Sequence, residues 1–229
     1  GLEWELNVPY MVGRYDTRPG WVARGGDARC SSADLNPREG IGPVPDYYTR
    51  IMPARMYWNG VHINIPGAGY ETLLSLTPAN VLPADGATYI GSARGDWRVG
   101  CLPALKKGGG EGFVVRLPNG EKYHFDWMAT RDTPDVLSNE YHVDALGNGT
   151  APPYLLVPTT DVFLYATKVE DRFGNHVLYH YDHANPHRLV SIVSSEGRRV
   201  DIEYGANGKV SRARWGERTW TYRYAPTSR

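Results

Sequence analysis

Alternating apolar and polar residues mark three successive segments in the last third of the chain. One side of each segment carries β-branched or aromatic residues, while the other side carries mostly polar ones. This alternation is typical of half-buried antiparallel strands and not of helices. The apolar sides are formed by Val177, Tyr179 and Tyr181, then by Val200, Ile202 and Tyr204, and then by Trp220, Tyr222 and Tyr224.

A glycine precedes each of these segments, and the tyrosine that closes each segment recurs at a nearly constant spacing. The glycines are Gly174, Gly197 and Gly216. The spacing is 23 residues from Tyr181 to Tyr204 and 20 residues from Tyr204 to Tyr224. A period of this length indicates stacked units, each of which buries its apolar face against its neighbours.

The middle of the chain predicts further hairpins. Alternating residues flank Asn59-Gly60 within 51–65, and Asn119-Gly120 within 113–126. An Asn-Gly pair between two alternating runs is a strong hairpin signal. Residues 128–160 are rich in Asp, Pro and Gly, so we expect them to form a loop that connects this region to the repeats.

The first 50 residues contain turn signals at short intervals and predict little regular structure. Leu2, Leu6 and Val8 alternate with polar neighbours and suggest one short strand, which Pro9 would end. The remainder is either a segment that wraps around the sheet or partly a linker. We favour wrapping, because the segment carries aromatic residues that need burial: Trp4, Trp21, Tyr47 and Tyr48.

These patterns predict an all-β protein with almost no helix, in which antiparallel hairpins stack into a twisted, curved sheet. We expect an irregular wrapping segment at residues 1–50, a β-rich region at 51–160 and a repeat array at 161–229. No run approaches the roughly 18 apolar residues of a membrane span. The 25 basic and 25 acidic residues balance, which argues against a nucleic-acid partner or an anionic membrane surface.

The run DRFGNHVLYHYD, followed by RLVSI and GRR, resembles the RHS/YD-repeat family, which takes its name from a Tyr-Asp pair, here Tyr181-Asp182. The second and third units end in Tyr204-Gly205 and Tyr224-Ala225, so one intact pair is present. The blocks GFVVRLPNGEKYHFD and DWRVGCL resemble the region before the repeats in bacterial RHS proteins of the polymorphic-toxin type. The repeat signature falls on Asp171, Gly174, Asn175, Tyr179, Tyr181, Asp182, Leu189, Ile192, Gly197, Arg198, Tyr204, Gly208, Trp220, Tyr222 and Tyr224.

The resemblance implies a non-enzymatic structural scaffold. Members of this family build a spiralling sheet that closes into a hollow shell, and in bacteria the shell commonly encloses a C-terminal toxin that is delivered to a competitor or host. The implied partners are the rest of the same polypeptide, with further repeats and the toxin, and components of a secretion system. The implied location is secreted or at the cell surface. We interpret the chain as a fragment that begins or caps the shell, without its export signal.

Candidate reaction chemistry is sparse. His176 and His180 share a strand face but lie about 13 Å apart at the usual rise per residue, so we expect no metal site and no cofactor. A Gly-x-Ser-x-Gly elbow is absent from the sequence, and we expect no enzymatic activity. Cys30 and Cys101 are the two cysteines. They form a possible disulfide if the protein is exported, and two separate thiols in a reducing cytosol.

Three tryptophans support an alternative function. Trp58, Trp97 and Trp127 lie beside predicted turns. We expect most of these rings to pack in the core or against a hairpin, but indole rings at the rim of a β-module can also stack on sugar rings. The alternative is therefore an extracellular module that binds carbohydrate or a surface, with these three residues as possible glycan contacts.

Overall fold

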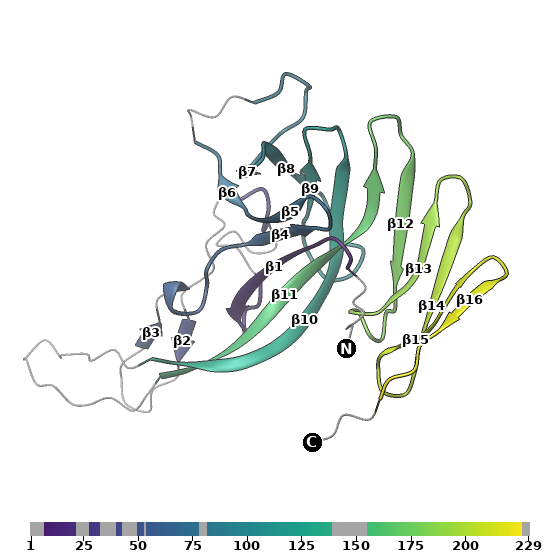
Figure 1. Ribbon diagram of the computed structural model, residues 1–229. Coiled ribbons are helices and arrows are strands. Elements are labelled where there is room, and N and C mark those ends of the chain that lie inside the picture. The colour runs from purple at the N-terminus through teal and green to yellow at the C-terminus, as the bar shows by residue number, and fades with distance from the viewer. Residues whose placement is uncertain are drawn as a thin grey trace, which may run out of the picture.

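The protein is a single open antiparallel sheet of 14 strands, accompanied by a separate two-stranded one. The computed structural model describes residues 7–21, 28–32, 40–42, 50–52, 54–77, 82–138 and 155–225. Within these ranges, the 3-10 turn η1 (Ala54–Met56) is the one helical element, and no helix is long and apolar enough to cross a membrane. The prediction of an all-β, antiparallel, curved sheet is confirmed (Figure 1).

In the main path of the sheet, each strand from β16 down to β6 pairs with the next one in sequence order. A branch leaves this path at β11, which also pairs with β1; β1 pairs in turn with β4, and β4 with β5. Strands β2 and β3 form the small sheet. The strands are β1 (Tyr10–Asp16), β2 (Gly40–Gly42), β3 (Arg50–Met52), β4 (His62–Ile65), β5 (Gly69–Thr72), β6 (Leu74–Ser75), β7 (Gly91–Ala93), β8 (Trp97–Leu102), β9 (Gly112–Arg116), β10 (Lys122–Ser138), β11 (Leu155–Glu170), β12 (His176–Tyr181), β13 (Leu189–Ser194), β14 (Arg199–Tyr204), β15 (Val210–Trp215) and β16 (Arg218–Thr221).

Strands β10 and β11 form the spine of the sheet and appear as two long curved ribbons in Figure 1. The expectation of a loop over 128–160 is therefore wrong for 128–138 and 155–160, which belong to β10 and β11 and pair across these two strands. Pro134 is tolerated because a register shift between Thr133 and Val136 takes it out of the ladder. The expected boundary at residue 160 falls inside β11, so the repeats and the preceding region share a strand.

Two adjacent bulges in this spine change which side of β10 is apolar. Asp126 and Thr167 both drop out of the pairing between β10 and β11. Phe125, before the bulge, lies in a first core, whereas Trp127, after it, lies in a second core on the opposite side of the sheet. The Thr167 hydroxyl donates a 2.6 Å hydrogen bond to the buried Asp126 carboxylate and so joins the two bulges.

The N-terminal region contributes a strand to the middle of the sheet. Strand β1 pairs with β11 along its whole length and with β4 at three positions. The expectation of an irregular segment at 1–50 is therefore wrong for Tyr10–Asp16. Residues 7–9 are not part of a strand, and most of the one suggested over Leu2–Val8 lies outside the described residues, as do Trp4, Tyr47 and Tyr48.

Of the two hairpins predicted at Asn-Gly pairs, one is confirmed. Strands β9 and β10 pair around Asn119-Gly120. Strand β4 instead pairs with β5 across the turn at 66–68, so the hairpin predicted at Asn59-Gly60 is wrong. The residues before that pair turn back in η1, where the N–H groups of Tyr57 and Trp58 bond to Ala54. This turn buries Tyr57 against Val157.

Candidate functional site

The three tyrosines that close the repeats make equivalent hydrogen bonds. Each hydroxyl donates to a main-chain carbonyl on the preceding strand and so closes the open end of its hairpin. The pairs are Tyr181 to Ala166 at 2.9 Å, Tyr204 to Leu189 at 3.0 Å and Tyr224 to Val210 at 2.8 Å, with sequence separations of 15, 15 and 14. The sequence period is thus a repeat of contacts in space.

The residue before each acceptor packs on the ring of the same tyrosine. The Tyr165 ring stacks on Tyr181 with 5.3 Å between centroids. The guanidinium carbon of Arg188 lies 5.2 Å from the centre of the Tyr204 ring, and the Lys209 ammonium lies 4.9 Å from that of Tyr224. The position next to the tyrosine ring is therefore equivalent in all three units. An aromatic ring occupies it in the first unit, and a cationic side chain occupies it in the other two.

Glycines with positive φ shape four of the turns between neighbouring strands, three of them in the repeats. Four turns share one bonding pattern, in which the glycine N–H donates to the carbonyl three residues earlier. Their φ angles lie in the left-handed region, which glycine adopts at little cost. They are Gly120 (91°), Gly174 (90°), Gly197 (83°) and Gly208 (76°).

The two aspartates of the signature cap loops. The Asp171 carboxylate accepts hydrogen bonds from the side chain and N–H of Asn175 and from the N–H of Phe173. The Asp182 carboxylate accepts from the N–H of Ala184 and the side chain of Asn185. These bonds lower the pKa of both carboxyls, chiefly through Asn175 for Asp171 and through the Ala184 N–H for Asp182.

Burial of the other signature residues decreases towards the end of the array. Leu189 is buried, and Tyr179, Ile192 and Tyr222 pack partly buried against the second core. Arg198 is exposed and pairs with Glu196 at 3.0 Å. Trp220 is 45% exposed, because β16 ends the strand path and has no further described strand beside it.

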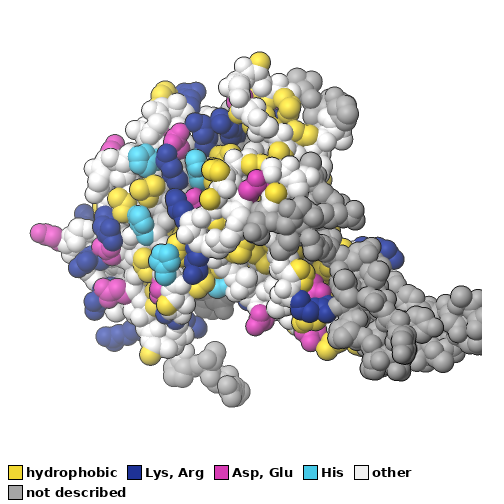
Figure 2. All heavy atoms as spheres, turned by 180° about the vertical axis from the view of Figure 1, so that it is seen from behind, with side chains coloured by type: hydrophobic (Ala, Val, Ile, Leu, Met, Phe, Trp, Pro, Cys, Tyr) yellow, Lys and Arg dark blue, Asp and Glu magenta, His cyan; other side chains and the backbone are white. Residues whose placement is uncertain are grey.

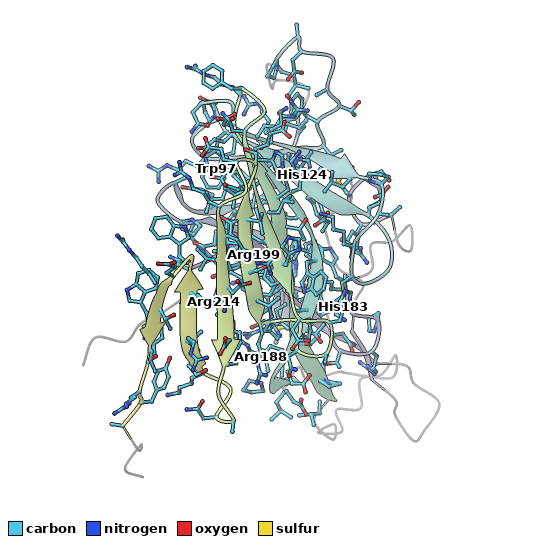
Figure 3. All side chains as sticks on the ribbon, turned by 90° about the vertical axis from the view of Figure 1, so that its right-hand side faces the viewer. Trp97, His124, His183, Arg188, Arg199 and Arg214 are labelled. Carbon is cyan, nitrogen blue, oxygen red and sulfur yellow. A yellow bond between two sulfur atoms is a disulfide. The ribbon has the colours of Figure 1, made fainter. Side chains whose placement is uncertain are left out.

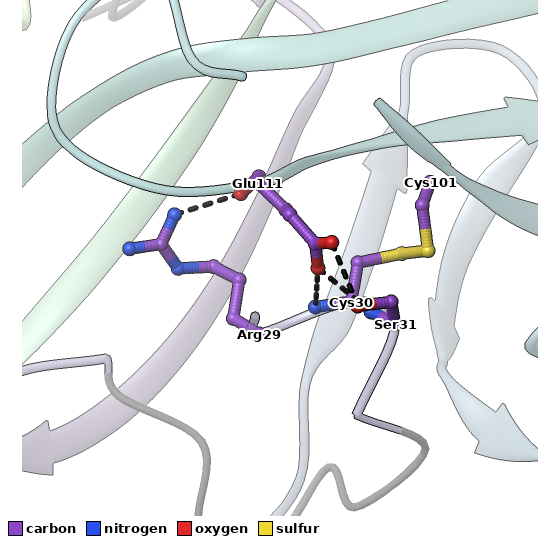
Figure 4. Close-up of a disulfide and its surroundings, with 5 residues drawn as sticks. All are labelled: Arg29, Cys30, Ser31, Cys101 and Glu111. Atoms are coloured by element: carbon purple, nitrogen blue, oxygen red, sulfur yellow. Dashed lines mark hydrogen bonds between the residues drawn. A yellow bond between two sulfur atoms is a disulfide. The ribbon is translucent and has the colours of Figure 1, made fainter. Parts of the chain in front are cut away.

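A disulfide fastens an N-terminal segment over the first core. Cys30 and Cys101 are bonded to each other. The Glu111 carboxylate accepts hydrogen bonds from the N–H groups of Cys30 and Ser31, and the Arg29 guanidinium donates to the Glu111 carbonyl at 2.7 Å (Figure 4). Segment 28–32 is therefore fastened to the sheet by covalent and hydrogen bonds. Trp21, also expected to pin this region, is buried.

The histidines are dispersed. His183 lies edge-on against Trp127 at 4.8 Å between ring centres. His187 Nε2 bonds to the Thr130 carbonyl, so Nδ1 accepts from the Tyr165 hydroxyl at 2.9 Å. Burial raises the pKa of Tyr165 to about 12, which keeps that hydroxyl a donor at neutral pH. Across the described ranges, no three His, Cys, Asp or Glu side chains are grouped so that they could hold a metal ion.

Two of the three tryptophans proposed as glycan contacts are buried. Trp97 is 5% and Trp127 6% exposed. Trp127 also stacks on Tyr181 and donates to the Pro186 carbonyl. These two rings are inaccessible to a sugar, because each belongs to a core. Trp58 is half-buried and lines a hollow at the surface.

This hollow has a volume of about 310 Å³ and lies between β1, β4, β5 and η1. Arg14 and Asp161 form an ion pair in its wall, with 2.8 Å between Nε and Oδ1. The rings of His62 and Tyr70 stack with 5.1 Å between centroids and 17° between planes. Burial lowers the pKa of His62 and raises that of Tyr70, so both rings are uncharged at neutral pH.

On one face of the molecule, Lys, Arg and His side chains lie near one another among acidic and hydrophobic ones (Figure 2). Glu170 lies between Lys122 and Lys168. In the repeats the Asp201 carboxylate forms ion pairs with both Arg199 and Arg214, and Figure 3 shows these two arginines on neighbouring strands. The bonds from Lys168 and Lys122 lower the pKa of Glu170 to about 2.

Comparison with protein-family models, with curated proteins and with solved structures gave no match to this chain. The arrangement of its own residues is therefore the basis for the proposals that follow.

Proposed function

We propose that this chain is a non-enzymatic scaffold, a piece of an RHS-type shell wall that would enclose and help deliver a C-terminal toxin. The observation that carries the proposal is the repeated bond from a tyrosine hydroxyl to a carbonyl 14 or 15 residues earlier. A unit that repeats both its sequence and its contacts can be added many times. The growing curved sheet then has one continuous inner surface.

The two ends of the strand path support a role at the beginning of such a wall. At one end, β1 and β4–β9 form non-repeating structure around the first core. At the other end, β16 is the last strand of the path, and Trp220 within it is 45% exposed. An exposed aromatic edge of this kind suits the addition of another hairpin. The disulfide favours an oxidising location, as expected of an exported protein.

The experiment is limited proteolysis of the full-length polypeptide that contains this chain, purified without added reductant. We expect a domain downstream of the repeats to resist a protease that digests the same domain when it is expressed alone. The isolated domain should also be toxic to bacteria. Equal digestion of the enclosed and isolated domains, or the absence of any further domain, would overturn the proposal.

Substitutions in the repeats test whether this protection depends on the repeat hairpins. Changing Tyr181, Tyr204 and Tyr224 together to Phe removes the three hydroxyl bonds, and we expect faster digestion of the enclosed domain. Tyr179→Phe is the matched control, since the Tyr179 hydroxyl has no hydrogen bond to a described residue. Unchanged protection in the triple variant would show that these hydrogen bonds of the repeats do not contribute to enclosing the domain.

A further inference from the structure

We propose that the hollow between β1, β4, β5 and η1 binds an oligosaccharide, with one pyranose ring stacked on Tyr70 and its hydroxyls bonded to Arg14 and Asp161. This site does not depend on the shell function. It also differs from the rim of three tryptophans expected from the sequence, because it uses Trp58 alone of the three.

An exposed, preorganised ring is the first requirement for stacking on a sugar, and Tyr70 meets it. Its side chain is 55% exposed, and one face of its ring is held nearly parallel to His62. The His62 ring is in turn fixed by a 3.2 Å hydrogen bond between Nδ1 and the Thr72 hydroxyl. The ring therefore loses little conformational entropy when a ligand covers its outer face.

Paired donor and acceptor groups beside this ring favour a neutral, hydroxyl-rich ligand. Arg14 and Asp161 face each other across paired strands and remain 41% and 22% exposed. A sugar hydroxyl both donates and accepts, so it can bond to the carboxylate and to the guanidinium at once. Arg55 also lines the hollow, so a cation is disfavoured there, while a neutral ligand can bond to the guanidinium and the carboxylate of the Arg14–Asp161 pair together.

The unpaired strand edge beside the hollow is short. A peptide that adds to a sheet needs a free strand edge along which its main chain can bond. Strand β1 pairs with β11 over its whole length and with β4 as far as Val12, so its unpaired edge covers only residues 13–16. Strand β5, which among the described strands pairs with β4 alone, is four residues long. Edges of this length suit a compact ligand better than an extended peptide.

A second hollow on the same face extends the site along β1. It also has a volume of about 310 Å³ and is lined in part by Tyr10, Phe163, Tyr165 and Arg131. Tyr10 and Arg14 are four residues apart on one strand, which corresponds to about 13 Å. Each volume lies at the lower end of the range for small-molecule sites, and two in line suit several linked sugars better than one.

The test is isothermal titration calorimetry of the disulfide-bonded protein with cellohexaose, chitohexaose, maltohexaose and mannohexaose. We expect at least one of them to bind with a Kd below about 1 mM. Tyr70→Ala should weaken that binding at least about tenfold, whereas Tyr70→Phe keeps the ring and the affinity. Asp161→Asn should weaken it as well.

Phe173→Ala is the matched control, because Phe173 is 75% exposed on a hairpin tip far along the chain from the hollow. Thermal unfolding of each variant shows that the fold is intact. The proposal is overturned if none of the four hexasaccharides binds at about 10 mM, or if Tyr70→Ala binds as tightly as the unchanged protein. Binding of extended decapeptides without any saccharide would also overturn it and would assign the face to a peptide.

Discussion

The Tyr181 hydroxyl donates a 2.9 Å hydrogen bond to the main-chain carbonyl of Ala166, a residue with no exposed surface. Tyr181 is itself only 5% exposed, so water cannot replace the bond if the hydroxyl is removed. A buried carbonyl without a donor is costly. This tyrosine therefore stabilises the junction between the spine strand β11 and the first repeat hairpin.

We expect Tyr181→Phe to lower the free energy of unfolding by about 1 to 3 kcal/mol, because the buried Ala166 carbonyl then has no hydrogen-bond donor. Tyr204→Phe should cost only about 1 kcal/mol, since its site is partly solvated. Urea-induced unfolding measures both values. Tyr179→Phe serves as the control and should change stability little, and a loss for this control as large as for Tyr181→Phe would contradict the assignment.

Reduction of the disulfide should destabilise the protein strongly. The bond closes a loop between residues separated by 71 positions, and the chain-entropy relation gives about 4 kcal/mol for a loop of this size. Urea unfolding with and without a phosphine reductant measures the difference. The double variant with Cys30→Ser and Cys101→Ser should show the lower stability in both conditions. Equal stability of the oxidised and reduced protein would contradict this expectation.

Acid should weaken the ion triad at Glu170. Its pKa is about 2 in the folded protein, against an ordinary value of 4.5. The folded value is depressed, so the stabilisation is fully present above pH 4.5 and is lost as the pH falls towards about 2. Glu170→Gln should cost about 1 kcal/mol at pH 7 and nothing below about pH 2.

Glu196 provides the control for that measurement. Its single ion pair with Arg198 is 66% exposed at the carboxylate and 72% at the guanidinium. Solvent screening makes such pairs nearly neutral for stability. Glu196→Gln should therefore change the free energy of urea-induced unfolding little at neutral pH. A loss at neutral pH that matches that of Glu170→Gln would show that pairing with two lysines has no special effect.

Two glycines in equivalent turns separate backbone strain from steric crowding. Gly197 has a φ of 83° and open space where a Cβ would lie, whereas at Gly120, with a φ of 91°, a Cβ would lie 2.8 Å from the Cβ of Arg172. We expect Gly197→Ala to cost about 1 kcal/mol from the left-handed backbone alone. Gly120→Ala should cost about 2 to 3 kcal/mol, because crowding adds to strain. Equal shifts in thermal unfolding would disprove the distinction.

The repeat hairpins could be predicted from the sequence because their signals are local. Each unit places alternating residues next to a glycine with positive φ, as at Gly174 and Gly197. Neighbouring hairpins then pair in sequence order. The bond from Tyr204 to Leu189 follows from that order, although the pattern identified the tyrosine and not its acceptor.

The spine was missed because its strands depend on partners distant in the sequence. Turn residues such as Asp132 and Pro134 predict a loop, yet β10 is held as a strand by β11. The bulge at Asp126 also reverses the apolar side of β10, and a rule of strict alternation cannot show that reversal. For the same reason the side of the sheet on which Trp127 packs could not be anticipated.

The hollow was missed for a related reason. Arg14, His62, Tyr70 and Asp161 come from four strands and carry no common motif. Their proximity depends on β1 lying between β4 and β11, in a region whose composition predicts irregular structure. Of the residues that line the hollow, only Trp58 was singled out as a possible ligand contact from the sequence, because it lies beside a predicted turn.

Strand β11 borders β10, β1 and β12 and contributes side chains to both cores. Unfolding of the part before β11 would remove a partner strand from the repeats, and the reverse also holds, so the first core and the first repeat hairpin should unfold together in one calorimetric transition. The protein would then resist heat as a unit, and truncation at residue 160 would yield two unstable halves instead of two modules.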